Sequence, residues 1–188
     1  MEGFPIPVCP PKRVNHHTPF RGEADGGFCA AKEEDDFGFP GLVLTTVDGV
    51  IAGVALTAAN VDERDALLER IRGALLSDKG FIRPLLTEEW SEMDIEPHPP
   101  LRKNRADSRP PSLVALLVLV RRRVETVIGQ LAERFSAEWI GARQLWQWVT
   151  RLYRKIAAHT LCVLINPSLG RPLLDFEGLV TESKLHIA

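Results

Sequence analysis

The strongest constraint on the fold is the dipeptide Asp48-Gly49, which separates two apolar runs rich in β-branched residues, 37–47 and 50–57. Asp-Gly between two such runs is the strongest short-range signal for a β-hairpin, because both residues tolerate the backbone angles of a tight turn. The sequence therefore predicts two adjacent antiparallel strands here.

The segments around this hairpin predict a mixture of strands and helices. Residues 3–8 predict a strand whose prolines, Pro5 and Pro7, restrict it to an edge, an end or an interrupted position. Residues 20–36 are rich in glycine and acids and predict a loop. The segments after the hairpin predict, in order, a helix over 60–72, a buried strand from 73 ending at Asp78, a helix over 84–93, a short strand over 95–101 and a basic loop over 102–112.

Two long helices are expected after the basic loop, over 113–135 and 141–165. In the first, apolar residues recur every three or four positions and form one stripe: Leu117, Val120, Val124, Ile128, Leu131 and Phe135. The apolar run Leu113–Val120 is far too short to span a bilayer, so we expect it to be the buried start of this helix. Trp146 and Trp148 in the second helix are expected in core or packing positions rather than as platforms on which bases stack. The alternation of strands and helices predicts an α/β domain layered around a central sheet.

Composition narrows the partners that the chain can bind. The 188 residues carry a net charge of −2, so contact with nucleic acid must come from local patches. One such patch lies between Leu101 and Arg123, where a single acid, Asp107, accompanies seven basic residues: Arg102, Lys103, Arg105, Arg109, Arg121, Arg122 and Arg123. The three cysteines form no C-x-x-C pair, which disfavours a disulfide framework or a zinc site and favours a reducing cytoplasm.

Glu125 is the residue with the most open interpretation. It points away from the apolar stripe of its helix, with Arg121 and Arg122 one turn earlier on its own side. Such a carboxylate serves either in a surface ion pair or as a metal ligand in a site that binds phosphate. The residues of this helix alone leave both readings open.

Several runs, in the same order, resemble the catalytic half of bacterial insertion-sequence transposases, most closely the insertion-sequence 982 family of RNase H-like DDE enzymes. The runs are 3–9, 20–24, 56–65, 77–81 and 124–131. The resemblance implies an RNase H-like mixed sheet flanked by helices over residues 1–140. It leaves residues 141–188 as a C-terminal helical extension and tail.

The resemblance also implies a reaction and its residues. In that family an Asp, an Asp and a Glu hold two divalent ions, usually Mg²⁺ with Mn²⁺ as a substitute, and the enzyme cuts element ends and joins them to target DNA. Asp78 matches the second acid, Glu125 the third, and Arg121 a phosphate contact. The residues expected to bind DNA are Arg102, Lys103, Arg105, Arg121 and Arg122. A cytoplasmic homo-oligomer on DNA, with no membrane partner, is expected.

The first acid departs from the family pattern. Glu2 stands where the family has an Asp before Gly-Phe-Pro, and its extra methylene displaces the carboxylate by about 1 Å, a misplacement that can cost about 10²-fold in rate. Met1 falls where the family's first strand is already under way, so we expect an N-terminal truncation. Two alternatives follow: a transposase that uses Glu2, Asp78 and Glu125, or a non-catalytic remnant that at most binds DNA or a full-length transposase.

Overall fold

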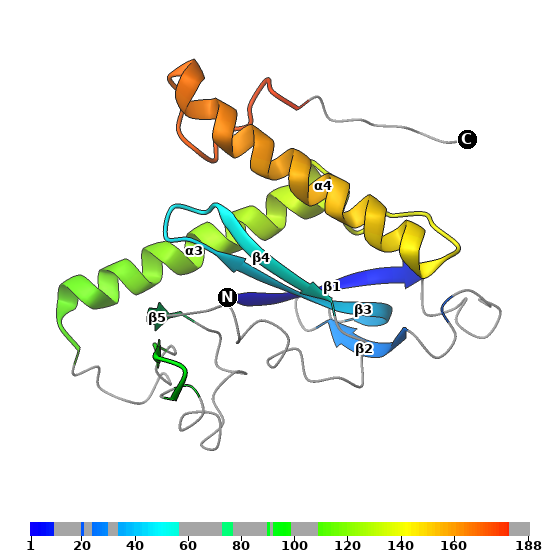
Figure 1. Ribbon diagram of the computed structural model, residues 1–188, viewed down its shortest axis with the longest axis horizontal. Helices are drawn as coiled ribbons and strands as arrows, with labels where there is room; N and C mark the ends of the chain where they lie inside the picture. The colour runs from blue at the N-terminus through cyan, green and yellow to red at the C-terminus, as the bar shows by residue number, and fades with distance from the viewer. Residues whose placement is uncertain are drawn as a thin grey trace.

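The centre of the fold is β3 (Glu34–Thr45), a strand of 12 residues that pairs with each of the other three strands of an antiparallel sheet (Figure 1). The computed structural model describes residues 1–9, 20, 24–29, 34–56, 73–76, 90, 92–98 and 109–180. β1 (Glu2–Cys9) lines one edge of β3, with Glu2 opposite Val43 and Ile6 opposite Phe39. The other edge is shared by β2 (Asp25–Cys29), along the start of β3, and β4 (Ile51–Leu56), along its end.

The predicted hairpin and first strand are confirmed. The turn between β3 and β4 is closed by hydrogen bonds between Thr46 and Val50, and Gly49 has a φ of 88° that favours glycine. The loop predicted over 20–36 is wrong in part, because residues 25–29 form β2 and β3 already begins at Glu34. Backbone pairing along β3 outweighs the low strand propensity of glycine and acidic residues there.

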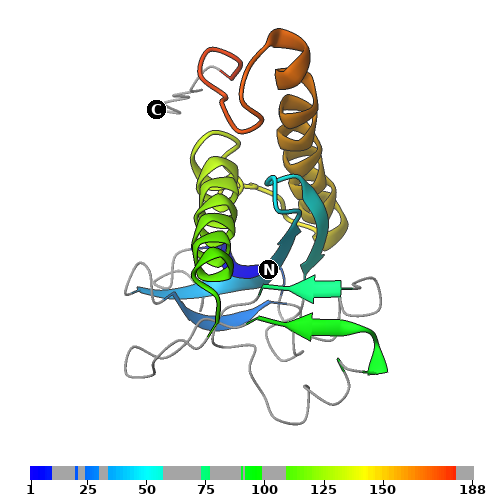
Figure 2. The same cartoon turned by 90° about the vertical axis from the view of Figure 1, so that its left-hand side faces the viewer.

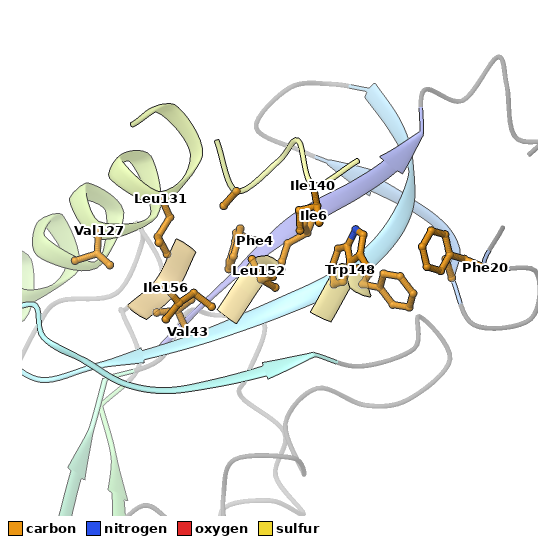
Figure 3. Packing of buried hydrophobic residues seen from close by; sticks show 13 residues of the cluster. Phe4, Ile6, Phe20, Val43, Val127, Leu131, Ile140, Trp148, Leu152 and Ile156 are labelled. Carbon is orange, nitrogen blue, oxygen red and sulfur yellow. The ribbon is translucent and has the colours of Figure 1, made fainter. Parts of the chain in front are cut away.

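The sheet has two apolar faces, because successive side chains of a strand point to opposite sides. One face carries Phe4, Ile6, Phe39 and Val43 and is covered by two helices, α3 (Pro111–Glu133) and α4 (Leu145–Ile165). Figure 2 shows both helices rising from the same side of the sheet. Figure 3 shows how they fill this core, with side chains from α3 (Val127 and Leu131) and from α4 (Trp148, Leu152 and Ile156) meeting those of β1.

α3 differs from its prediction in one respect. The helix is present, and its buried residues are Val120, Val124, Val127 and Leu131. The run from Leu113 to Val120 is not a buried start, since Leu116, Val118 and Leu119 are 44–48% exposed. The first half of α3 extends past the four-stranded sheet (Figure 1), so core contacts begin only at Val120.

The second apolar face packs on a small parallel pair, β5 (Gly73–Leu75) and β6 (Ile95–Pro97). Both are shorter than the strands predicted there. Their cluster contains Met1, Leu42, Ala55, Leu75, Trp90 and Ile95. The amino group of Met1 donates a hydrogen bond of 2.7 Å to the carbonyl of Leu76, which brings the start of β1 next to the end of β5. Trp90 and Glu92 are helical and Met93 lies in a turn. Residues 84–89 and 91 of the helix predicted over 84–93, and all of the helix predicted over 60–72, lie outside the described residues.

The C-terminal part of the described chain is tied to the helices. α4 leads into a 3₁₀ turn, η3 (Asn166–Leu169), and the buried amide of Asn166 donates to the carbonyls of Leu173 and Asp175. Trp148, Leu152 and Ile156 share the core of the sheet, so α4 packs on the first 140 residues, and a domain boundary at 140/141 stays a prediction. In the described part of the chain, no helix is long and apolar enough to cross a membrane.

Candidate metal centre

Glu2, the first of the three candidate ligands, lies at the start of β1. The alternation of side chains along β1 places Glu2 on the same face as Phe4 and Ile6, which is the face covered by α3. Its side chain is partly buried. The neighbouring amino group of Met1 is mostly buried, and this burial lowers its pKa, while the negative charge of Glu2 acts in the opposite direction. The carboxylate of Glu2 therefore interacts electrostatically with the amino group of Met1.

Glu125 lies on α3 between two buried anchors, Val124 and Val127. Its side chain is 54% exposed, and Oε1 accepts a hydrogen bond of 3.1 Å from Nε of Arg121, one turn earlier. The surface ion pair that the sequence allowed is thus present. An exposed pair of this kind contributes only a few tenths of a kcal/mol to stability. The position of Glu125 is therefore set by the packing of α3 rather than by its ion pair with Arg121.

Asp78, the second predicted ligand, lies outside the described residues. The nearest described residue before it is Leu76, whose carbonyl accepts the hydrogen bond from the amino group of Met1. The structure therefore brings the residue before Glu2 into contact with the residue two positions before Asp78. Among the described residues, no group of three or more His, Cys, Asp or Glu side chains could hold a metal ion.

The basic residues predicted to bind DNA divide into two sets. Arg121 and Arg122 are exposed on α3. Arg102, Lys103 and Arg105 lie outside the described residues. Arg123 has a structural contact that the sequence did not indicate, because Nη1 donates to the carbonyl of Val47 at 2.5 Å and lies 3.8 Å from Oδ1 of Asp48. It attaches α3 to the β3–β4 turn.

The two tryptophans of α4 differ from the prediction that both lie in core or packing positions. Trp148 is 1% exposed and its ring centroid lies 4.8 Å from that of Phe39, whereas Trp146 is 66% exposed. Residues two apart on a helix are separated by about 200° around its axis, so they cannot share one face. That spacing is the signal by which the sequence could have separated them.

The described arrangement is that of an α/β protein with one candidate carboxylate on its first strand and another on a helix that packs over the same face of the sheet. A family model described as "Transposase DDE domain" matches residues 1–144, which is 144 of the 188 residues. The chain belongs to this family of DDE transposases. No curated protein and no solved structure matches it.

Proposed function

We propose that the protein is a metal-dependent transposase that cuts DNA at the ends of an insertion sequence and joins those ends to target DNA. The observation that carries the proposal, beyond the family, is the hydrogen bond from Met1 to Leu76. It brings the start of β1, which bears Glu2, next to the end of β5, whose following residue Leu76 precedes Asp78 by two positions in the sequence. We further propose membership of the insertion-sequence 982 group and activity as a cytoplasmic homo-oligomer on DNA.

The donor chemistry of the residues fits two divalent ions. Carboxylate oxygens are the ligands that Mg²⁺ and Mn²⁺ prefer, and Glu2, Asp78 and Glu125 would supply them. A bound metal pair stabilises both the attacking and the leaving oxygen during displacement at phosphorus. On ligation, Glu125 would exchange its contact with Arg121 for a cation. The released guanidinium of Arg121 would then bind a DNA phosphate, with Arg122 beside it.

An RNase H-like sheet is part of the proposal. Such a sheet places its first strand in the centre. β1 pairs with β3 on one side, and its preceding residue bonds to the end of β5, which in turn pairs with β6 in parallel. The structure pairs β4 with β3 and β3 with β1 in one sheet and β5 with β6 in a second sheet, so an RNase H-like order of β4, β3, β1, β5, β6 would require β1 and β5 to pair where the hydrogen bond from Met1 to Leu76 brings them together.

The test is DNA cleavage by purified full-length chain. Linear DNA carrying the ends of an insertion sequence is incubated with Mg²⁺ or Mn²⁺, and nicked and joined products are resolved on a denaturing gel. Asp78→Ala and Glu125→Gln should abolish the nicked and joined products, and Glu2→Asp should change the rate of DNA cleavage. Glu133→Gln, an exposed acid at the end of α3, is the matched control and should cleave like the parent. Cleavage that survives Asp78→Ala rejects the proposed centre.

A second candidate function is DNA binding without cleavage. It is favoured by the Arg121–Glu125 ion pair and by the amino group of Met1 beside Glu2, because both cationic groups compete with a metal ion for these carboxylates. Calorimetric titration with Mn²⁺ separates the two candidates. Heat that corresponds to binding, and that is lost in Glu125→Gln, supports the enzyme; DNA binding in EDTA with no metal heat supports the second candidate.

A further inference from the structure

The segment from Trp139 to Ile165 has a charge unlike that of the rest of the chain. It contains no acidic residue and four basic ones, Arg143, Arg151, Arg154 and Lys155, whereas the whole chain is net negative at −2. Most of this segment, from residue 145 on, also lies beyond the residues matched to the transposase family. A local excess of positive charge of this kind attracts a polyanion.

Two of the four basic residues have a structural role, because they bind backbone carbonyls of the connection between α3 and α4. Lys155 donates to the carbonyls of Phe135 and Ser136 at 2.7 and 2.9 Å, and burial lowers its pKa. Arg151 donates to the carbonyls of Ile140 and Gly141. Because both contacts attach the connection after α3 to α4, they fix the position of the residues on that connection, including Trp139 and Arg143.

The other two basic residues are exposed and lie near exposed aromatic residues in the sequence. Arg143 and Arg154 form no ion pair with any residue that the structure describes, and both are exposed. Trp139 is 77% exposed, Trp146 66% and Tyr153 47%. Nε1 of Trp146 donates to Oε1 of Gln144 at 2.8 Å, which orients the indole ring. Tyr153 follows Trp146 by two helical turns, so the two rings lie on one face about 10 Å apart.

We propose that Trp139, Arg143, Trp146, Tyr153 and Arg154, here called the α4 aromatic–basic surface, bind unpaired nucleotides of DNA. Rings that are oriented and exposed offer stacking platforms to bases that are not paired, while guanidinium groups between them contact the phosphates. The identity of the nucleic acid as DNA rests on the proposed function. The surface is distinct from the candidate metal centre, because none of its five residues belongs to that centre.

The surface lies away from that centre. Trp148, on the opposite side of α4 from Trp146, packs on Phe39, which pairs with Ile6 of β1. Glu2, four residues before Ile6 in β1, pairs with Val43. Four residues along a strand span about 13 Å. A strand of DNA whose cleaved end lies at Glu2 would therefore reach this surface with nucleotides several positions from the cut.

The test measures oligonucleotide binding by the full chain in EDTA, so that the result does not depend on the metal centre. A fluorescein-labelled oligothymidylate is titrated and its anisotropy recorded over a range of salt concentrations. Trp146→Ala should weaken binding about tenfold or more. The double variant Arg143→Ala/Arg154→Ala should reduce the slope of log K against log salt by about 1.4, as expected for two phosphate contacts to a single strand.

Leu161→Ala/Leu164→Ala is the matched control, since both residues are exposed on α4 but outside the surface, and it should bind the oligonucleotide like the parent. Unchanged affinity in both Trp146→Ala and the double arginine variant would overturn the proposal. So would tight binding to vesicles of phosphatidylglycerol and phosphatidylcholine that Leu161→Ala/Leu164→Ala abolishes, because that result identifies a lipid surface. Loss of cleavage in Asp78→Ala with intact oligonucleotide binding separates the two sites.

Discussion

Nε2 of His159 on α4 lies 3.0 Å from Oε1 of Gln130 on α3, and this pair joins the two helices inside the protein. Nε2 of the Gln130 amide donates to the carbonyl of Leu174 at 2.7 Å, which fixes the amide so that its oxygen faces the imidazole. His159 therefore carries its proton on Nε2. Its Nδ1 is buried without a hydrogen-bond partner among the described residues, next to the rings of Phe135 and Phe176.

We expect the free energy of unfolding to decrease as the pH is lowered, because His159 is buried in its neutral form. Burial lowers the pKa of His159 to about 4, whereas an unfolded histidine titrates near its ordinary value of 6.5. Between these values the unfolded chain binds a proton that the native protein does not. The free energy of unfolding should therefore be highest above pH 6.5 and fall by on the order of 3 kcal/mol as the pH approaches 4. Urea melts across this range measure it.

The controls for this experiment are two glutamine variants. His159→Gln should flatten the dependence, because the titrating group is gone. His98→Gln, at the end of β6, should leave it as steep as in the parent. A parent curve that is flat between these pH values, or a steep curve in His159→Gln, would show that another group is responsible.

Gly38 on β3 should tolerate no side chain. A Cβ at this position would overlap the carbonyl of Ile6 and lie 2.9 Å from Cα of Pro7, so two backbones would have to separate. Gly38→Ala should cost about 3 kcal/mol or more. Gly129→Ala on α3 is the opposite case, since nothing lies within 4 Å of a Cβ there, and it should stabilise by about 0.5–1 kcal/mol. Thermal melts of both variants check the pair, and a Gly38→Ala protein as stable as the parent would contradict the β1–β3 register.

Trp148 and Trp146 should differ sharply when each is replaced by alanine. Trp148→Ala removes a fully buried ring that packs on Phe39 and should cost about 3–5 kcal/mol. Trp146→Ala removes an exposed ring and should change stability by no more than about 0.5 kcal/mol. Chemical denaturation measures both, and equal losses would mean that α4 is rotated from the described position.

Glu125→Gln should separate stability from activity. The variant loses one exposed ion pair, with Arg121, and should unfold within about 0.5 kcal/mol of the parent. It should nevertheless lose metal-dependent DNA cleavage, because an amide is a poor ligand for a hard cation. Denaturation and cleavage are measured on one preparation. A large loss of stability would instead indicate a structural role for this carboxylate.

The elements that the sequence predicted well are those with a local signal. Asp48-Gly49 marked the β3–β4 hairpin, and the apolar period marked α3 and α4, because turn geometry and helical spacing are properties of neighbouring residues. β2 was missed because its residues have low strand propensity and are held by pairing with β3. The exposure of Leu116 was missed because it depends on where the sheet ends.

The candidate site was predictable only in part. Glu125 and its pairing with Arg121 follow from spacing on one helix. The approach of Met1 to Leu76 joins residues 75 positions apart, and no local pattern encodes it. The arrangement of Glu2, Asp78 and Glu125 as one metal centre remains a prediction from the resemblance, and Asp78 lies outside the described residues.

The role of β3 as the partner of three strands has a consequence for folding kinetics. Its pairing with β4 spans a short turn, while its pairing with β1 joins residues about 30 to 40 positions apart and requires a long loop to close. We expect the β3–β4 hairpin to form in the rate-limiting transition state and β1 to dock afterwards. Substitutions in the hairpin would then slow folding, whereas substitutions in β1 would mainly accelerate unfolding, a difference that stopped-flow refolding can measure.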